Sequence, residues 1–230
     1  MARASHGSVL DDLGVRIASG EVAAGSVLTL AQLEEHYEVS RTVIREAVRV
    51  LEAKQMLVSR RRVGVTVQQP ELWSNLDAQL IRWRLDGPQA DQQIVALTEL
   101  RLAIEPTAAR LMARHADPLE RAQLLQLAEQ LQRLGDAGQG DSDEYLDADI
   151  EFHNLILTAS RNPLFSSIKE TVAEMLTGRH SHGQTPANPF EDALANHVAA
   201  ARMIADGDED AAEAATRRYV EAVLSEVAVD

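Results

Sequence analysis

Hydrophobic residues recur at the spacing of an α-helix along most of this chain, and only two short runs have the composition of a β-strand. These runs cover residues 56–59 and 63–67, and the second has valine at every other position. Helices bring apolar side chains to one face every three to four residues, whereas strands do so at every second residue. No segment after Pro70 has a strand pattern. We therefore expect a mainly α protein whose strands all lie before residue 70.

The first 70 residues predict three helices followed by a hairpin. Helices are expected over residues 9–19, over a short segment after Thr29 and over residues 40–53. Thr29 begins a capping-box pattern, and Ser40 is a typical N-cap residue for the third helix. Three helices followed by a β-hairpin are the element order of a winged helix-turn-helix. This order predicts a DNA-binding domain over residues 1–70.

The third predicted helix carries a stripe of arginines. Arg41, Arg45 and Arg49 are four residues apart and share one face, opposite an apolar stripe. Arginine suits guanine edges and phosphates, so we expect this face to read the major groove. Arg62 and Gly64 lie at or near the turn of the hairpin, where they could contact the neighbouring DNA backbone or the minor groove. The alternative is a solvated helix whose arginines pair with nearby glutamates.

The net charge of −14 at first argues against DNA binding, but the charge is unevenly distributed. Residues 1–69 carry 9 basic and 8 acidic residues, whereas the remainder carries 13 basic and 28 acidic ones. A locally basic face can hold phosphate on an acidic protein because salt screens remote charges. The chain has no cysteine, which excludes disulfides and thiolate metal sites, and no apolar run long enough for a membrane helix. We expect a cytoplasmic protein.

The rest of the chain predicts a connector helix or linker over residues 71–89 and an all-α antiparallel bundle over residues 90–230. His180 and His182 fall between predicted helices and are expected to be exposed. Helices are expected over residues 72–85, 94–115, 118–134, 143–160, 164–176, 189–205 and 208–227.

Several polar residues fall on or beside the buried faces of these helices. Asp149 and His153 lie one turn apart, and His197 and Arg101 lie in or next to apolar stripes of two other helices. Burying such groups is costly unless they pair or bind a ligand. Two histidines and a carboxylate leave positions open on a divalent metal, and an arginine would fork onto an anionic ligand. The alternative is ordinary buried histidines, with Arg101 and Glu105 as a plain helix pair.

The stretch from Ile17 to Val67, with the core "SRTVIREAVRVLEA" at residues 40–53, resembles the DNA-binding domain of the GntR family of bacterial regulators. The resemblance implies that Arg41, Arg45 and Arg49 face DNA. It also implies that Ser40 and Thr42 contact phosphate and that Gly64 lies in the wing.

The segments "ELRLAIEPTAARLMA", "DADIEFHNLILTASRNPLF" and "NHVAAARMIADGDEDAAEAA" resemble the FCD ligand-binding domain of the FadR-type branch of that family. This resemblance implies that Asp149, His153 and His197 bind a divalent metal, with zinc first and nickel or manganese as alternatives. It also implies that Arg101 faces the effector cavity, and we expect Tyr219 there as well. Members that bind metal often have a histidine where this chain has Tyr219.

These observations predict a homodimeric transcription regulator, not an enzyme, that binds a palindromic double-stranded operator and senses a small carboxylate. The segment "WSNLDAQLIRWRL" resembles repressors of sugar-acid catabolism, such as galactonate or gluconate regulators. One alternative is a metal-dependent hydrolase that uses Asp149, His153 and His197 around an activated water. Another is a protein-interaction bundle with a degenerate site.

Overall fold

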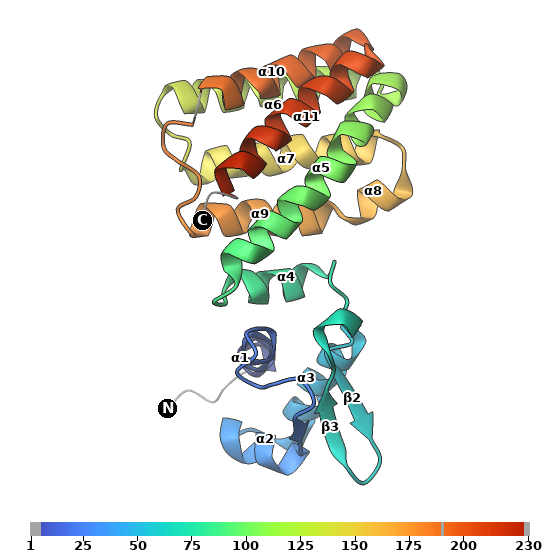
Figure 1. Cartoon of the computed structure of the whole chain (residues 1–230), viewed down its shortest axis with the longest axis vertical. Coiled ribbons are helices and arrows are strands. Elements are labelled where there is room, and N and C mark those ends of the chain that lie inside the picture. Colours follow the sequence, from blue (N-terminus) through green and yellow to red (C-terminus); the bar gives the residue numbers. More distant parts are fainter. Residues whose placement is uncertain (1–5, 190, 228–230) are drawn as a thin grey trace. The chain divides into compact units, whose positions relative to one another are not determined.

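The computed structural model describes residues 6–189 and 191–227, and the chain divides into two compact units, residues 1–90 and 91–230 (Figure 1). Both units are mainly helical, and all strands of the described residues lie in the first unit. This confirms the predicted mainly α fold with an N-terminal winged helix-turn-helix. No helix in the described part of the chain is long and apolar enough to cross a membrane. The finer division into residues 1–70, 71–89 and 90–230 stays a prediction.

The first unit holds three helices, a small sheet and a fourth helix. Strand β3 is the centre of an antiparallel sheet with the order β1-β3-β2, and Val58 of β2 lies opposite Thr66 of β3. The elements are α1 (His6–Ala18), β1 (Val27–Leu28), α2 (Leu30–Tyr37), α3 (Arg41–Ala53), β2 (Leu57–Arg60), β3 (Gly64–Val67), a 3₁₀ turn (Pro70–Leu72) and α4 (Ala78–Leu85).

The amphipathic pattern of α3 fixes its place in this unit. Its apolar side chains are buried, while α1 packs against both α3 and α4. The capping box predicted at Thr29 is present. The Thr29 hydroxyl accepts a hydrogen bond from the Gln32 amide, and the Gln32 side-chain oxygen accepts one from the Thr29 amide. The core of the unit is apolar and includes Leu13, Ile17, Ile44, Leu51, Met56, Leu57, Val65, Val67, Leu80 and Trp83.

Three details of this unit differ from the sequence prediction. Strand β1 is absent from the prediction because two residues are too short to show a period. The helix predicted over 72–85 begins only after Asp77, whose side chain caps α4 by accepting from the amide of Leu80. Ser40 does precede α3, but its hydroxyl makes no capping hydrogen bond.

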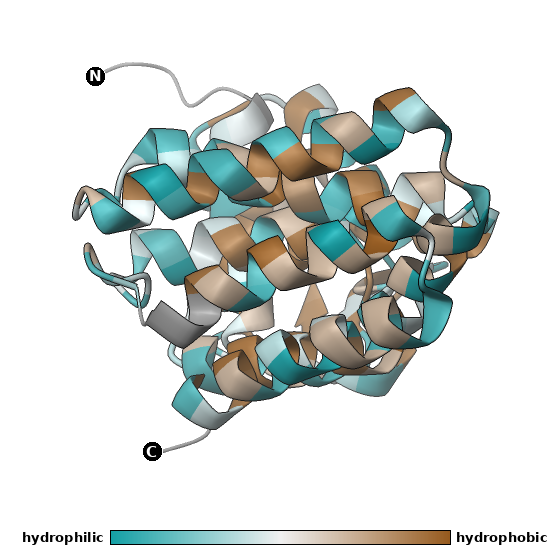
Figure 2. Ribbon diagram, turned by 90° about the horizontal axis from the view of Figure 1, so that it is seen from above, coloured by the Kyte–Doolittle hydropathy of each residue, from teal (hydrophilic) through white to brown (hydrophobic). Residues whose placement is uncertain are grey.

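The second unit is a bundle of helices. Helix α10 packs against α6 and α11, and α7 packs against α6 and α9. In Figure 2, hydrophobic and hydrophilic residues alternate along the helices, as expected of amphipathic segments. The helices are α5 (Ala90–His115), α6 (Pro118–Asp136), α7 (Asp143–Ala159), α8 (Pro163–Ser167), α9 (Lys169–Ser181), α10 (Glu191–Asp206) and α11 (Glu209–Val227).

Helices α8 and α9 correct the single helix predicted over residues 164–176. The chain turns at Ile168, and α9 then continues to Ser181. His180 therefore lies in the last turn of a helix and is partly buried, contrary to the expectation of an exposed loop. His182 follows the helix and is exposed, as predicted.

Candidate functional site

Helix α3 presents its arginines on the exposed face of the first unit. Arg41, Arg45 and Arg49 are exposed, as is Thr42 next to them. Two of the arginines have acidic neighbours: Arg49 Nη1 lies 2.5 Å from Glu46, and Arg41 Nε lies 3.7 Å from a carboxylate oxygen of α2. Exposed ion pairs of this kind contribute little, so the guanidinium groups can exchange these partners for phosphate or base edges.

A groove of about 370 Å³ runs between α3 and the turn of the β2–β3 hairpin. Glu52 ties helix and hairpin together, since its carboxylate accepts from the amide of Ser59 at 2.8 Å. Arg62 and Gly64 adopt positive φ angles of 65° and 126°, which shape the tight turn. Besides Glu52, the charged residues that line the groove are all arginines: Arg45, Arg49, Arg60, Arg61 and Arg62. The groove is thus a concave, positively charged surface of the kind that phosphate requires.

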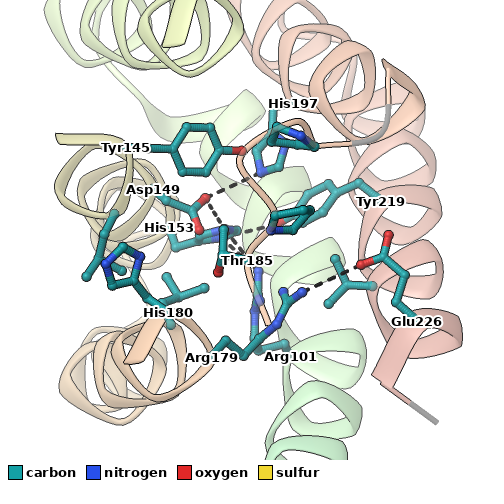
Figure 3. A pocket seen from close by; sticks show the side chains of 15 residues that line it. Arg101, Tyr145, Asp149, His153, Arg179, His180, Thr185, His197, Tyr219 and Glu226 are labelled. Atoms are coloured by element: carbon teal, nitrogen blue, oxygen red, sulfur yellow. Dashed lines mark hydrogen bonds and ion pairs between the residues drawn. The ribbon is translucent and has the colours of Figure 1, made fainter. Parts of the chain in front are cut away.

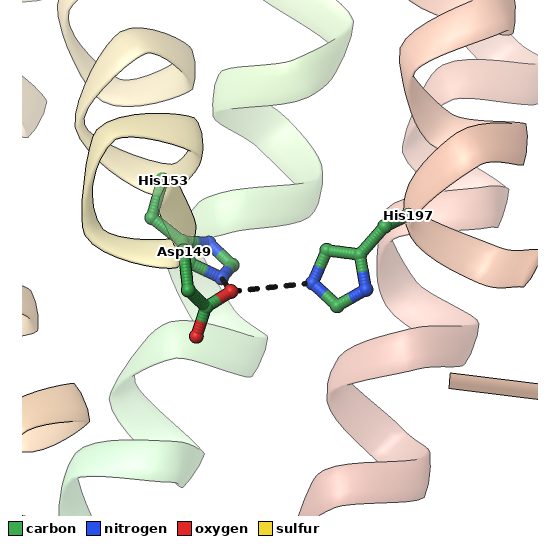
Figure 4. Close-up of side chains that lie close together, drawn as sticks. All are labelled: Asp149, His153 and His197. Atoms are coloured by element: carbon green, nitrogen blue, oxygen red, sulfur yellow. Dashed lines mark ion pairs between the residues drawn. The ribbon is translucent and has the colours of Figure 1, made fainter. Parts of the chain in front are cut away.

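In the second unit, α7 and α10 bring one carboxylate and two imidazoles together (Figure 4). Asp149 and His153 share a face of α7, and their Oδ1 and Nε2 atoms are 3.3 Å apart. His197 of α10 points its Nε2 at the same carboxylate oxygen, 3.6 Å away. Both histidines are buried, whereas the Asp149 side chain keeps 17% of its exposure and faces a cavity.

These three side chains fit a divalent metal. One donor atom from each lies within 4.8 Å of the others. A zinc ion about 2.1 Å from each donor would hold them roughly 3.4 Å apart, so small side-chain rotations are enough. Imidazole and carboxylate donors suit zinc, nickel and manganese, and three protein ligands leave positions open for water or a ligand. The structure therefore brings together the residues predicted to bind metal.

Glu105 of α5 lies behind this cluster and was not predicted as a site residue. It is fully buried, accepts from Arg101 Nε at 2.7 Å and lies 3.0 Å from His153 Nδ1. Burial disfavours its charge, but Arg101 and His153 outweigh that effect and hold the pKa of Glu105 well below its usual range. A carboxylate at Nδ1 orients the imidazole so that Nε2 faces the metal position.

Tyr219 of α11 completes this inner network. Its hydroxyl donates to Glu105 and lies 3.1 Å from His153 Nδ1, while its ring stacks on His197 with centroids 4.8 Å apart. Burial raises the pKa of the Tyr219 hydroxyl well above its usual value, so the group stays protonated. Arg101 Nη2 also lies 3.0 Å from His153 Nε2. A metal ion bound to His153 Nε2 would therefore have to displace this guanidinium contact.

The cluster forms one side of a cavity in the second unit (Figure 3). Arg101 and Tyr219, the residues expected to face an effector, both line this cavity. Sequence reasoning missed four further polar residues of its wall: Tyr145, Arg179, Thr185 and Glu226. His180, expected in solvent, lines the cavity as well. Arg179 was missed because the predicted helix ended before it.

An arginine-lined winged unit together with a cavity that holds charged groups defines an effector-controlled DNA-binding protein. Comparison with known families agrees with this class: residues 6–67 match the profile of bacterial regulatory proteins of the gntR family, and residues 96–222 match the FCD domain. The chain belongs to the GntR family of transcriptional regulators, with an FCD domain as its effector-binding part. These matches give no support to the alternative of a metal-dependent hydrolase.

Individual relatives extend over most of the chain. The galactonate operon transcriptional repressor of Escherichia coli K12 is 30% identical over 207 residues, which cover 88% of each chain. The uncharacterised HTH-type regulator YieP of the same organism is 31% identical over 68% of each chain. Among solved structures, a GntR protein of Streptococcus agalactiae is 25% identical, with a TM-score of 0.54 over 96% of this chain and 99% of its own. Lar of Listeria monocytogenes shares the fold, with a TM-score of 0.68 over 99% and 98% of the two chains at 15% identity.

Proposed function

We propose that this protein represses an operon for the catabolism of a sugar acid or another small carboxylate, and that it leaves its operator when that acid binds. The observation that carries the DNA-binding half is the groove of arginines between α3 and the hairpin turn. The similarity to a galactonate operon repressor supports the choice of effector class.

In this proposal Arg41, Arg45 and Arg49 read the major groove, and the backbone of the DNA lies along the hairpin turn at Arg62 and Gly64. The hydroxyl of Ser40 makes no capping hydrogen bond, so in this proposal it contacts phosphate together with Thr42. A regulator of this kind acts as a homodimer, so its operator is a palindrome whose half-sites mirror the two-fold axis.

We further propose that Asp149, His153 and His197 hold a divalent cation, with zinc first and nickel or manganese as alternatives. A cation held there would supply a Lewis acid for the carboxylate of the effector. Arg101, which contacts His153 Nε2, would give up that contact to such a cation, and its guanidinium would be free to bind the effector carboxylate. Tyr219 keeps the imidazole of His197 in place through ring stacking and forms part of the cavity wall.

Operator binding tests the first half. Arg45→Ala should weaken binding to DNA from the promoter beside the protein's own gene by about tenfold or more, because one guanidinium contact to a base is worth roughly 1–3 kcal/mol. Arg202→Ala removes another exposed arginine, from the second unit, and is the matched control. Equal affinities for the two variants would contradict the assignment of α3.

Release by the effector tests the second half. Galactonate or a related acid should dissociate the operator complex only when divalent metal is present. His197→Ala should keep operator affinity but lose this response. Because coupling is reciprocal, operator DNA should weaken acid binding by the same factor. If the acid releases the operator from His197→Ala as well as from the wild-type protein, the proposed role of the metal in effector binding is wrong.

A further inference from the structure

Arg179 and Glu226 stand between two cavities of the second unit. Both side chains line the inner cavity that holds Asp149 and His153, and both also line an outer cavity that opens beside the start of α5. Arg179 Nη2 and a carboxylate oxygen of Glu226 are 3.6 Å apart, an ion pair drawn in Figure 3. This pair therefore forms a shared wall, and any molecule that occupies both cavities has to displace it.

The two cavities differ greatly in size. The space open to the centres of water molecules is about 60 Å³ in the inner cavity and about 590 Å³ in the outer one. The inner cavity has room for only a few water molecules, which is enough for one carboxylate group beside the metal position. A six-carbon sugar acid is larger than this space, and the outer cavity behind Arg179 and Glu226 offers room for its far end.

Arg179 is poorly satisfied for a buried cation. Only 9% of the residue is exposed. Its Nη2 donates to the carbonyl of Gln184 at 3.3 Å, but its Nε has no hydrogen-bond partner among the described residues. The distance to Glu226 exceeds that of a hydrogen bond. Burial lowers the pKa of Arg179 and raises that of Glu226, in keeping with a pair too far apart to form a hydrogen bond.

Arg101, the other guanidinium of the inner cavity, is different. Its carboxylate partner Glu105 lies 2.7 Å away and is as deeply buried as Arg101 itself. Arg101 therefore has a permanent counter-charge, whereas Arg179 has only a long contact to a side chain near the outer cavity. A ligand anion can replace Glu226 at Arg179 and form the forked hydrogen bonds that Glu226 does not make.

We propose that Arg179 is a specificity-determining residue that binds a second anionic group at the far end of the effector. The effector is then an acid with charges at both ends, a dicarboxylic sugar acid or a phosphorylated one. A monocarboxylate of the same length also breaks the pair of Arg179 and Glu226, but it gives Arg179 no new partner. This inference rests on the proposed function, since it assumes that the first carboxylate lies at the metal position.

Galactarate and galactonate test the inference because they differ only at the far end, where one has a carboxylate and the other a hydroxymethyl group. The full chain is loaded with zinc, and binding of each acid is measured by titration calorimetry. We expect galactarate to bind at least about tenfold more tightly, the worth of one charge-assisted contact. In Arg179→Gln the ratio of the two affinities should fall to within about threefold, with zinc affinity unchanged in chelator competition.

Arg133→Gln is the matched control, because it removes an exposed arginine of the same unit and should keep the ratio of the wild-type protein. Glu226→Gln removes the competing carboxylate and should tighten galactarate binding. The pair 6-phosphogluconate and gluconate is measured in parallel, and a preference confined to that pair identifies the far group as phosphate.

The outcomes separate this inference from the proposed function. If wild-type protein binds the one-charge and two-charge acids equally well, the role of Arg179 is overturned while sugar-acid sensing stands. A charge preference that survives in Arg179→Gln overturns it as well. If none of the acids binds or releases operator DNA, both the inference and the proposed effector class are overturned.

Discussion

Replacing Glu105 with glutamine removes one negative charge from the centre of the second unit while keeping the shape of the side chain. The carboxylate receives Arg101 Nε at 2.7 Å and Arg101 Nη2 at 3.3 Å, and it also accepts from the hydroxyl of Tyr219. A glutamine offers only one accepting oxygen, so its amide nitrogen must face one of these donors. The Arg101 guanidinium, with 2% exposure, loses its counter-charge.

Breaking a buried ion pair by removing one partner costs about 3–5 kcal/mol, because the remaining charge stays buried and uncompensated. For a unit of this size, that loss corresponds to a fall in melting temperature of roughly 10 °C or more. Glu209→Gln is the matched control. Glu209 receives the Arg114 guanidinium at 2.6 and 3.0 Å, but at the surface, where water replaces the lost partner. No measurable destabilisation is expected there.

The two units can be followed separately during unfolding in urea. Both tryptophans, Trp73 and Trp83, lie in the first unit, so their fluorescence reports on the DNA-binding part. Far-ultraviolet circular dichroism follows the helices and is dominated by the larger second unit. Glu105→Gln should shift the circular dichroism transition to lower urea by more than the fluorescence transition. If Glu105→Gln is no less stable than Glu209→Gln, the reasoning about the buried network is refuted.

Three further predictions concern single positions. Gly14→Ala should destabilise the first unit by about 1–3 kcal/mol and alter tryptophan emission, because a Cβ there would lie 2.6 Å from the ring of Trp83; unchanged emission and stability would contradict the packing of α1 on α4. Gly64→Ala should lower the free energy of unfolding by about 2–3 kcal/mol and weaken operator binding, since φ is 126° and the Cβ would lie 2.5 Å from the carbonyl oxygen of Leu28. Urea titration measures the stability and a mobility shift measures operator binding. A variant with wild-type stability and affinity would contradict this prediction. Tyr219→His should add a fourth ligand and raise zinc affinity at least about tenfold in chelator competition, whereas no gain would show that the metal lies out of its reach.

Where an element depends only on residues near it in the chain, helical spacing and capping patterns were enough to predict it from the sequence. The α3 stripe and the Thr29 capping box follow from spacing within one helix, and both are present. The start of α4 depends instead on a distant contact. Asp77 receives Lys54 Nζ at 2.7 Å, and the amide of Ser74 donates to the carbonyl of Lys54, so residues 73–77 are pinned to the end of α3 rather than helical. Nothing in the spacing of residues 72–85 indicates this tie.

The site shows the same limit. Asp149 and His153 can be paired from sequence because helical geometry places residues four apart on one face. That His197 meets them depends on how α10 packs in the bundle, and only the family resemblance indicated it. For Glu105, the sequence predicts no more than an ordinary helix pair with Arg101. Arg101 and Glu105 do form a helix pair. Glu105 is also part of the site, because it is fully buried and lies next to His153 Nδ1. Burial of this kind is a property of the assembled bundle.

The tie between Lys54 and Asp77 has a consequence for signalling. Lys54 follows the last residue of α3 and Asp77 caps α4, and the Lys54 ammonium also lies 5.7 Å above the ring of Trp83. Helix α4 is thus held to the end of α3 by a partly exposed ion pair and a cation–π contact. The segment predicted as a connector belongs to the packed core of the first unit through Leu80 and Trp83. Only residues 86–89 then separate α4 from α5, which carries Arg101 and Glu105 of the sensing site. If effector binding displaces α5, the short connection is the chain segment through which the displacement would reach α4 and, through Lys54 and Asp77, the end of α3.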